Sequence, residues 1–192
     1  MVSPDEILQF WLDECGPEHW FEQDETLDQT IRDRFGDTWQ GATQGQYGLW
    51  LTYPNGALAY IILTDQFSRN MFRDDARAFA TDRAALAAAK SAIAKGWDLR
   101  VDPPARQFFY TPLEHSENLC DQDRAVRLSC ERMKDAAFLL HARAHREVIR
   151  QFGRFPHRNA CLGRKTTAVE QSHLDGGGYG AMVRNLQQAT AA

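Results

Sequence analysis

The sequence lacks the features that mark several large classes of protein. No stretch approaches the roughly 18 uninterrupted apolar residues of a membrane span, and the residues from Met1 to Glu6 contain neither a basic start nor an apolar signal region. The four cysteines lack the close pairs of zinc or redox motifs, which indicates reduced thiols rather than a disulfide framework. We therefore expect a cytoplasmic protein that does not associate with a membrane.

Basic charge is also scarce. The chain has 22 Lys and Arg residues against 26 Asp and Glu residues, a formal net charge of -4, so it offers no basic field for nucleic acid. It contains no Gly-x-Ser-x-Gly elbow, dinucleotide fingerprint or calcium loop, and Gly176 to Gly178 lacks the Lys-Ser or Lys-Thr ending of a P-loop. The sequence thus implies no nucleic-acid partner and no cofactor.

Strand patterns are missing as well, since no segment alternates polar and apolar residues for long, although Gly48 to Thr52 could pass as a strand locally. Helical spacing is present instead. It predicts helices over residues 4–14, 26–39, 76–95, 121–133 and 135–152, with shorter segments at 105–110 and 166–174. We expect one all-α domain over residues 1–182, built as stacked helix hairpins or a bundle, and a mobile tail over residues 183–192.

Large aromatic residues recur at helical spacing and predict a packed core rather than a stacked cofactor. They are Trp11, Trp20, Phe35, Trp39, Phe108 and Phe109.

Two Arg-Asn pairs each follow a Phe after a helix-like run. In the first block, Asp65-Gln66-Phe67-Ser68-Arg69-Asn70, Asp65 and Arg69 continue the apolar face of Leu58 and Ile62. A guanidinium on a buried face must be paired or must hold an anion. Asp65 and Arg69 are four residues apart and can form an ion pair, so this block either fixes packing or, with Asn70, binds a ligand.

The second block, Arg154-Phe155-Pro156-His157-Arg158-Asn159, follows the helix stop at Gly153. Its proline stiffens the turn, so the polar side chains emerge from a rigid backbone. Arg154, Arg158 or the more distant Arg164 could donate two parallel hydrogen bonds to a carboxylate or phosphate. The amide of Asn159 could add a directional hydrogen bond. The alternative is that these residues tie helix ends together by bonding orphan carbonyls.

Histidines near carboxylates supply the ingredients of acid–base chemistry. His115 and Glu117 lie in Glu-His-Ser-Glu at 114–117, but neighbouring positions on a helix need not enter one site. His141 and His145 have the spacing of metal ligands, yet the usual glutamate and a third ligand are missing, so we predict no metal site. His145 is expected on the inward face of its helix.

The segments Leu8 to Trp11, Ala57 to Asn70, Ala76 to Asp82, Pro112 to Glu117 and Phe152 to Arg164 together resemble the family named domain of unknown function 924. The resemblance spans about residues 3–180. It implies a tetratricopeptide-like all-helical fold and no assigned activity. The sequence shows no 34-residue self-similarity, so a peptide-binding role rests on analogy alone.

Two hypotheses follow from these residues. In the first, both Arg-Asn blocks and the His115 region converge in one pocket for a small anion. Arg69 and Arg158 then neutralise the charge, Asn70 and Asn159 supply amides, and His115, Glu117 or His157 moves a proton if there is turnover. In the second, the chain is a helical-repeat module that binds a protein or peptide, and the blocks only brace it. The sequence leaves open whether the protein is an enzyme and whether it dimerises.

Overall fold

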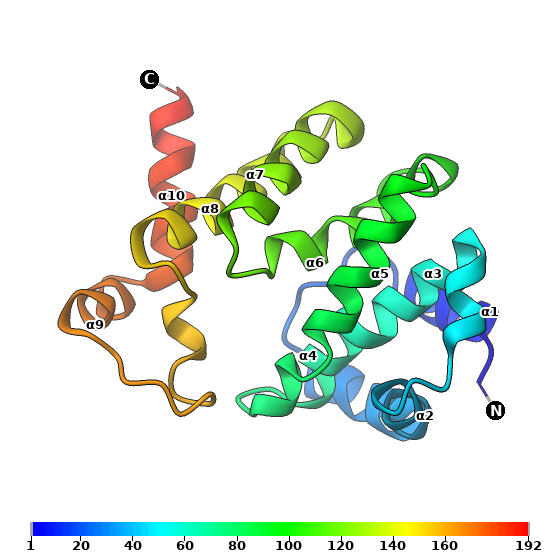
Figure 1. Cartoon of the computed structure of the whole chain (residues 1–192). Coiled ribbons are helices and arrows are strands. Elements are labelled where there is room, and N and C mark those ends of the chain that lie inside the picture. Colours follow the sequence, from blue (N-terminus) through cyan, green and yellow to red (C-terminus); the bar gives the residue numbers. More distant parts are fainter. Residues whose placement is uncertain (1, 192) are drawn as a thin grey trace. The chain divides into compact units, whose positions relative to one another are not determined.

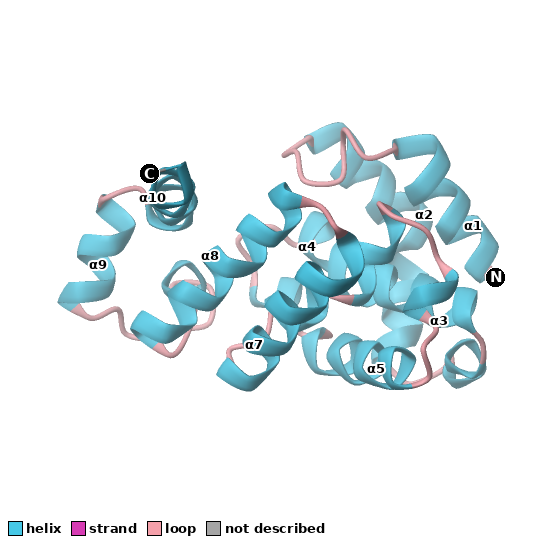
Figure 2. Ribbon diagram, turned by 90° about the horizontal axis from the view of Figure 1, so that it is seen from above, coloured by secondary structure: helices cyan, strands magenta, loops and turns pink. Residues whose placement is uncertain are grey.

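The described part of the chain, residues 2–191 of a computed structural model, consists of helices and loops without a strand (Figures 1 and 2). This confirms the predicted all-α class. None of the helices in that range has the length and apolar character that crossing a bilayer requires. The chain forms two compact units, Met1–Pro112 and Leu113–Ala192, which we call the N-terminal and C-terminal units. The single domain over residues 1–182 and its tetratricopeptide-like stacking stay predictions.

The N-terminal unit is built from α1 to α5 and the start of α6 (Figure 1). Its helices are α1 (Pro4–Leu8) with a π-helical continuation (Gln9–Cys15), α2 (Glu25–Thr43), α3 (Pro54–Ile61) with a π-helical continuation (Ile62–Phe67), α4 (Ser68–Met71), α5 (Asp82–Ala94) and α6 (Thr111–Glu114). Short 3-10 helices lie between them at Gly48–Thr52, Ala76–Phe79, Asp98–Arg100 and Ala105–Phe109. The segment Gly48–Thr52 is therefore helical rather than a strand.

Local chemistry explains where these helices begin. Ser3 and Glu6 form a capping box at the start of α1, the helix predicted from residue 4. The helix predicted from residue 76 begins instead at Asp82, because Asp75 caps a separate 3-10 turn by accepting the backbone N–H of Arg77 at 2.8 Å. Thr81 is buried, and its hydroxyl donates to the carbonyl of Thr64 at 2.5 Å. The chain therefore turns before α5 starts.

The predicted aromatic core is confirmed, since every residue proposed for it is buried. The ring centroids of Trp11 and Phe67 lie 5.3 Å apart in an edge-to-face arrangement, and those of Trp20 and Phe108 lie 4.7 Å apart. Phe35 packs on Phe67 at 4.9 Å. These contacts join α1, α2, the segment after α3 and the turn before α6 around one centre.

The C-terminal unit consists of α7 (Leu119–Leu128) with a π-helical continuation (Ser129–Met133), α8 (Ala136–Phe152), a 3-10 turn (Pro156–Arg158), α9 (Ala168–Asp175) and α10 (Gly178–Ala191). The side chain of Asn118 caps α7, so the predicted start at Asp121 is two residues late. The predicted ends of α8 are confirmed: Asp135 caps its start and Gly153 closes it at φ +70°.

Helix α8 packs against both α7 and α10. The core of this unit contains Ala144, Val148, Ile149, Phe155 and Met182, with Phe152, Tyr179, Val183 and Leu186 packed against it. Residues 183–191 are helical, because α10 presents apolar side chains to α8 at helical spacing. The mobility expected of residues 183–192 stays a prediction, and Ala192 lies outside the described residues.

Two glycines in helices give opposite predictions for replacement by alanine. A Cβ at Gly56 in α3 would lie 2.4 Å from the backbone oxygen of Trp50 and 2.7 Å from the Tyr53 ring, whereas one at Gly36 in α2 would touch nothing within 4 Å. We expect Gly56→Ala to lower the free energy of unfolding by about 1 to 3 kcal/mol through overpacking. Gly36→Ala should raise it by about 0.5 to 1 kcal/mol.

The check is urea unfolding followed by tryptophan fluorescence, since all five tryptophans lie in residues 1–112. Equal effects of the two substitutions would contradict the close approach of the backbone at Gly56.

Candidate functional site

The first Arg-Asn block lies within the N-terminal unit, where carboxylates surround Arg69. Its guanidinium donates to Asp82 through two nitrogens, at 2.8 and 3.0 Å, and lies 3.2 Å from Asp65 Oδ1. Burial alone would lower the pKa of Arg69, but the charges of Asp65 and Asp82 outweigh it and raise that pKa. The expected ion pair between Asp65 and Arg69 is present, and Asp82 joins it as a second carboxylate, which the spacing along the sequence did not indicate.

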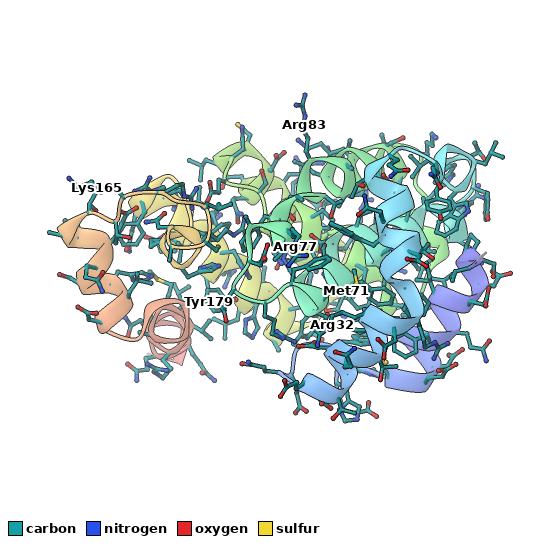
Figure 3. All side chains as sticks on the ribbon, turned by 90° about the horizontal axis from the view of Figure 1, so that it is seen from below. Arg32, Met71, Arg77, Arg83, Lys165 and Tyr179 are labelled. Carbon is teal, nitrogen blue, oxygen red and sulfur yellow. The ribbon has the colours of Figure 1, made fainter. Side chains whose placement is uncertain are left out.

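Asn70 and its neighbours join α2 to the end of α4. The Asn70 amide donates to Asp28 Oδ1 at 2.8 Å, and Arg73 donates to both oxygens of the same carboxylate. Arg32 donates to the carbonyl of Met71 at 3.0 Å; both residues are labelled in Figure 3. The side chains of this block therefore hold two helices together through charge-assisted hydrogen bonds.

The second block begins with an equally complete pair. Arg154 donates to Glu170 at 2.6 and 2.9 Å, and also to the carbonyl of Lys165 at 2.8 Å. Glu170 in turn accepts the backbone N–H of Thr167 at the start of α9. The hydrogen bonds from Arg154 and from Thr167 lower the pKa of Glu170 far below its usual range. Arg154 thus fixes the N-terminus of α9.

Arg164 and Glu117 form a second bidentate pair in this unit. Arg164 donates to the two Glu117 oxygens at 2.7 and 3.0 Å and to the carbonyl of Phe155 at 3.0 Å, while Glu117 accepts the N–H of Phe155 at 2.8 Å. Burial acts to raise the pKa of Glu117, but the hydrogen bonds from Arg164 and Phe155 prevail and lower it. Glu117 is therefore an ionised anchor for the second block rather than a proton donor.

The remaining members of the second block lie on the turn that these pairs hold. Arg158 is buried, and its guanidinium carbon lies 4.4 Å from the Phe155 ring centroid. Asn159 is also buried, with its Nδ2 donating to Thr166 at 3.4 Å and its Oδ1 without a hydrogen-bond partner. His157 is exposed, with its ring 5.6 Å from that of Phe155.

Beside this turn, five residues form what we call the histidine cluster: Glu114, His115, His141, His145 and Tyr179. Tyr179, labelled in Figure 3, belongs to α10, and its hydroxyl lies 2.7 Å from Nδ1 of His141 and 3.3 Å from Nδ1 of His145. His145 Nδ1 also lies 3.0 Å from the carbonyl of His141 and 3.6 Å from a Glu114 oxygen. The His115 and His145 rings are 6.0 Å apart.

The environment fixes the protonation of the cluster. Burial, followed by the nearby His115, holds the pKa of His145 well below its usual value, with smaller contributions of the same sign from Arg158 and His141. Burial also lowers the pKa of His141 and raises that of Tyr179, together with the charge of Glu114. At neutral pH, His145 is thus uncharged and Tyr179 keeps its proton.

The hydrogen bonds then assign the tautomers. Nδ1–H of His145 donates to the His141 carbonyl, which leaves its Nε2 with a free lone pair. The Tyr179 hydroxyl and Nδ1 of His141 share a hydrogen bond of 2.7 Å. Nε2 of His145 is therefore a proton acceptor in a mostly buried position, which is the property expected of a binding or catalytic histidine.

The predicted site residues fall into both units. Asp65, Arg69 and Asn70 belong to the N-terminal unit, whereas His115, Glu117, His145, Arg154, His157, Arg158, Asn159 and Arg164 belong to the C-terminal unit. The convergence of the two blocks on one pocket stays a prediction. Within the C-terminal unit, His115, His145 and Arg158 lie near one another.

The sequence pattern did not indicate Glu114, His141 or Tyr179 as members of a binding site. Glu114 lies inside the Glu-His-Ser-Glu motif, and His141 has only the spacing of a metal ligand. Tyr179 follows Gly176 to Gly178 and carries no signal of its own. Among residues 2–191, no group of three or more His, Cys, Asp and Glu side chains is arranged to hold a metal ion.

Comparisons with known proteins agree with the resemblance seen in the sequence. The model of the family described as bacterial protein of unknown function, DUF924, matches residues 7–178. A solved structure of a protein of unknown function from Agrobacterium tumefaciens is 39% identical, with a TM-score of 0.86, covering 90% of this chain and 97% of that one. No curated protein matches the chain.

Arg69 and Arg77 provide a matched test of how much a buried pair stabilises the fold. Arg69 is 19% exposed and leaves the fully buried Asp65 behind when removed, whereas Arg77 is 62% exposed and pairs with an exposed Asp75. We expect Arg69→Met to cost about 3 to 5 kcal/mol in unfolding free energy. Arg77→Met should cost far less, because its pair is exposed to solvent, and tryptophan-detected urea unfolding measures both changes. Similar losses in both variants would show that Arg69 does not brace the unit.

The lowered pKa of His145 makes stability depend on pH. Because the folded pKa lies below the unfolded value, the unfolded state takes up a proton first as the pH falls below about 6.5. Stability is therefore lost from that pH down to the folded pKa, by up to about 1.4 kcal/mol per pH unit from this group. The NMR titration of the His145 ring, assigned with His145→Gln, should give a pKa below 6.5. A pKa at or above the ordinary histidine value would contradict the neutral, buried imidazole and the tautomers that follow from it.

Proposed function

Because this chain belongs to DUF924, a family of bacterial proteins of unknown function, we propose its function from the histidine cluster: binding of a small anion, a carboxylate or phosphate, beside His145. One observation carries the proposal. His145 is mostly buried and uncharged, and after burial the nearby His115 and Arg158 lower its pKa. An anion placed beside His145, on the side away from Glu114, would raise that pKa again.

The charge distribution along the chain supports the same conclusion. Residues 113–192 contain 12 Arg and Lys residues against 9 Asp and Glu residues, whereas residues 1–112 contain 10 against 17. The C-terminal unit is thus formally positive within an acidic chain. A positive unit attracts anions over about a Debye length, which is near 10 Å at 0.1 M salt.

The tautomers indicate which side of His145 the anion approaches. Glu114 lies 3.6 Å from Nδ1 and repels negative charge there, while Nε2 carries the free lone pair. We therefore place the anion at the Nε2 edge, where protonation of His145 turns this atom into a donor. Arg158 supplies positive charge, and the Tyr179 hydroxyl holds the His141 ring in place through their hydrogen bond.

This chemistry includes proton transfer, because an anion bound beside the imidazole would raise its pKa and let Nε2 take up a proton. His145 makes no hydrogen bond to a Ser, Thr or Cys side chain among residues 2–189, so the arrangement supports a general base or a binding group rather than an activated nucleophile. Turnover, if present, then consists of proton abstraction from a bound acid.

The interaction module remains the second candidate, and the pairing of the arginines favours it. Arg69, Arg154 and Arg164 each donate to a carboxylate through two nitrogens, so these guanidinium donors are used in hydrogen bonds within the fold. These three side chains thus behave as braces, and a partner would then use another part of the surface.

Calorimetric titration tests the anion site directly. Phosphate, acetate and succinate are added at pH 6.5 in bis-tris and, separately, in imidazole, since these cationic buffers do not compete. Binding should take up about one proton, seen as a difference in heat between the buffers, and should tighten by up to about tenfold per pH unit on acidification.

Two variants complete the test. His145→Gln should bind more weakly and take up almost no proton, whereas His19→Gln, an exposed histidine of the N-terminal unit, should behave like the parent. No heat from any of the three anions, or equal proton uptake in His145→Gln, would contradict the proposal.

A further inference from the structure

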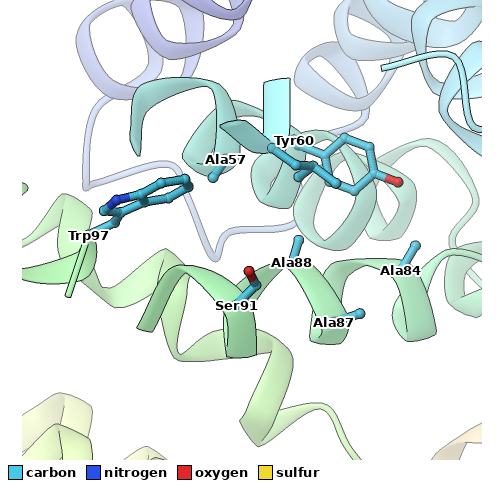
Figure 4. A pocket seen from close by; sticks show the side chains of 8 residues that line it. Ala57, Tyr60, Ala84, Ala87, Ala88, Ser91 and Trp97 are labelled. Atoms are coloured by element: carbon cyan, nitrogen blue, oxygen red, sulfur yellow. The ribbon is translucent and has the colours of Figure 1, made fainter. Parts of the chain in front are cut away.

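The N-terminal unit contains a hollow that is separate from the arginine pairs. It lies between α3 and α5 and has a volume of about 280 Å³ (Figure 4). Its lining consists of Leu51, Ala57, Tyr60, Ala84, Ala87, Ala88, Ser91 and Trp97. Most of these side chains are apolar, and the volume approaches the lower end of small-molecule sites.

Helix α5 forms one wall of the hollow. Ala84, Ala87, Ala88 and Ser91 lie at offsets 0, 3, 4 and 7 and therefore share one helical face, which is about 10 Å long. Their short side chains leave the space open, and Trp97 stands at the end beyond Ser91 (Figure 4). The wall thus fits an elongated apolar body rather than a compact polar one.

Tyr60 gives the hollow a polar group that lacks a partner. The residue is only 7% exposed and lines the space from α3, and its hydroxyl makes no hydrogen bond to any of residues 2–189. Burial of the residue raises its pKa, so it keeps its proton. This O–H is therefore available to an acceptor atom of a molecule in the hollow.

A cation lies beside Trp97, next to the lining residues. Lys95 follows Ser91 by one helical turn, is exposed, and holds its ammonium 4.2 Å from the Trp97 ring centroid. It forms no ion pair with a carboxylate among residues 2–189. The hollow is therefore mostly apolar, with the Tyr60 hydroxyl in its lining and a positive charge near its Trp97 wall.

We propose that this hollow binds a small, elongated carboxylic acid. The carboxylate lies at Lys95, the apolar body packs along Ala84, Ala88 and Trp97, and a polar group at the far end accepts the proton of Tyr60. Charge complementarity at Lys95 selects an acid over a neutral molecule of the same shape.

Octanoate, octanamide and 8-hydroxyoctanoate are the probes, and titrations follow tryptophan fluorescence because Trp97 lines the site. Octanoate should bind the parent, and octanamide should bind about two- to fivefold more weakly, which is the effect of an exposed ion pair. Lys95→Gln should remove this preference for the acid, whereas Lys165→Gln, a surface lysine of the other unit shown in Figure 3, should keep it.

Filling the hollow gives the decisive comparison. Ala87 and Ala94 are both exposed on α5, but only Ala87 lines the space. Ala87→Phe should abolish octanoate binding, and Ala94→Phe should leave it unchanged. The parent should bind 8-hydroxyoctanoate more tightly than octanoate. The Tyr60→Phe variant should bind the two acids with equal affinity. No binding of octanoate at millimolar concentration, or equal binding by the two alanine variants, would overturn the assignment.

Discussion

A guanidinium group taken out of water must have a carboxylate beside it, and both units of this chain depend on that constraint. In the N-terminal unit, Arg69 of α4 lies between Asp65 and Asp82. Separation of α4 from the start of α5 would therefore leave buried charge uncompensated. In the C-terminal unit, Arg164 fixes Glu117 and, through it, the backbone at Phe155. The pairs set the positions of the polar turns, and the aromatic cores fill the space around them.

Polar groups whose hydrogen bonds are all made within the fold stabilise it, whereas polar groups with an unused donor or acceptor are candidates for ligand binding. The paired arginines donate two guanidinium N–H groups each to carboxylates of the fold. They therefore hold helices together and offer few donors to a ligand. His145 and Tyr60 differ, because each is mostly buried and retains a lone pair or a proton that no side chain of the fold uses. The two proposed sites lie in different units and have different chemistry: one accepts anionic charge among imidazoles, and the other accepts an apolar acid.

The helices could be predicted largely from local signals. The capping box at Ser3, the cap at Asp135 and the stop at Gly153 act within one turn of the chain, and the structure confirms the predicted helix starts near residues 4 and 135 and the stop at Gly153. The errors lie where distant contacts compete with local preference. Residues 76–81 carry a helical composition, but Thr81 donates to Thr64 and the chain turns before α5. The final segment has polar composition, yet α10 forms because α8 supplies an apolar surface for it.

The sequence shows which residue types the candidate site contains and which four-residue spacings allow a pair, such as Asp65 with Arg69. The other contacts depend on how separate helices pack. Asp82 and Glu170 reach their arginines from 13 and 16 residues away, and Tyr179 reaches His141 from 38. The pKa of His145 also depends on this assembly, since burial and the charges around the ring exist only after the helices have packed. Spacing along a helix governs contacts between neighbouring turns, whereas the meeting of separate helices depends on the packing of the whole unit.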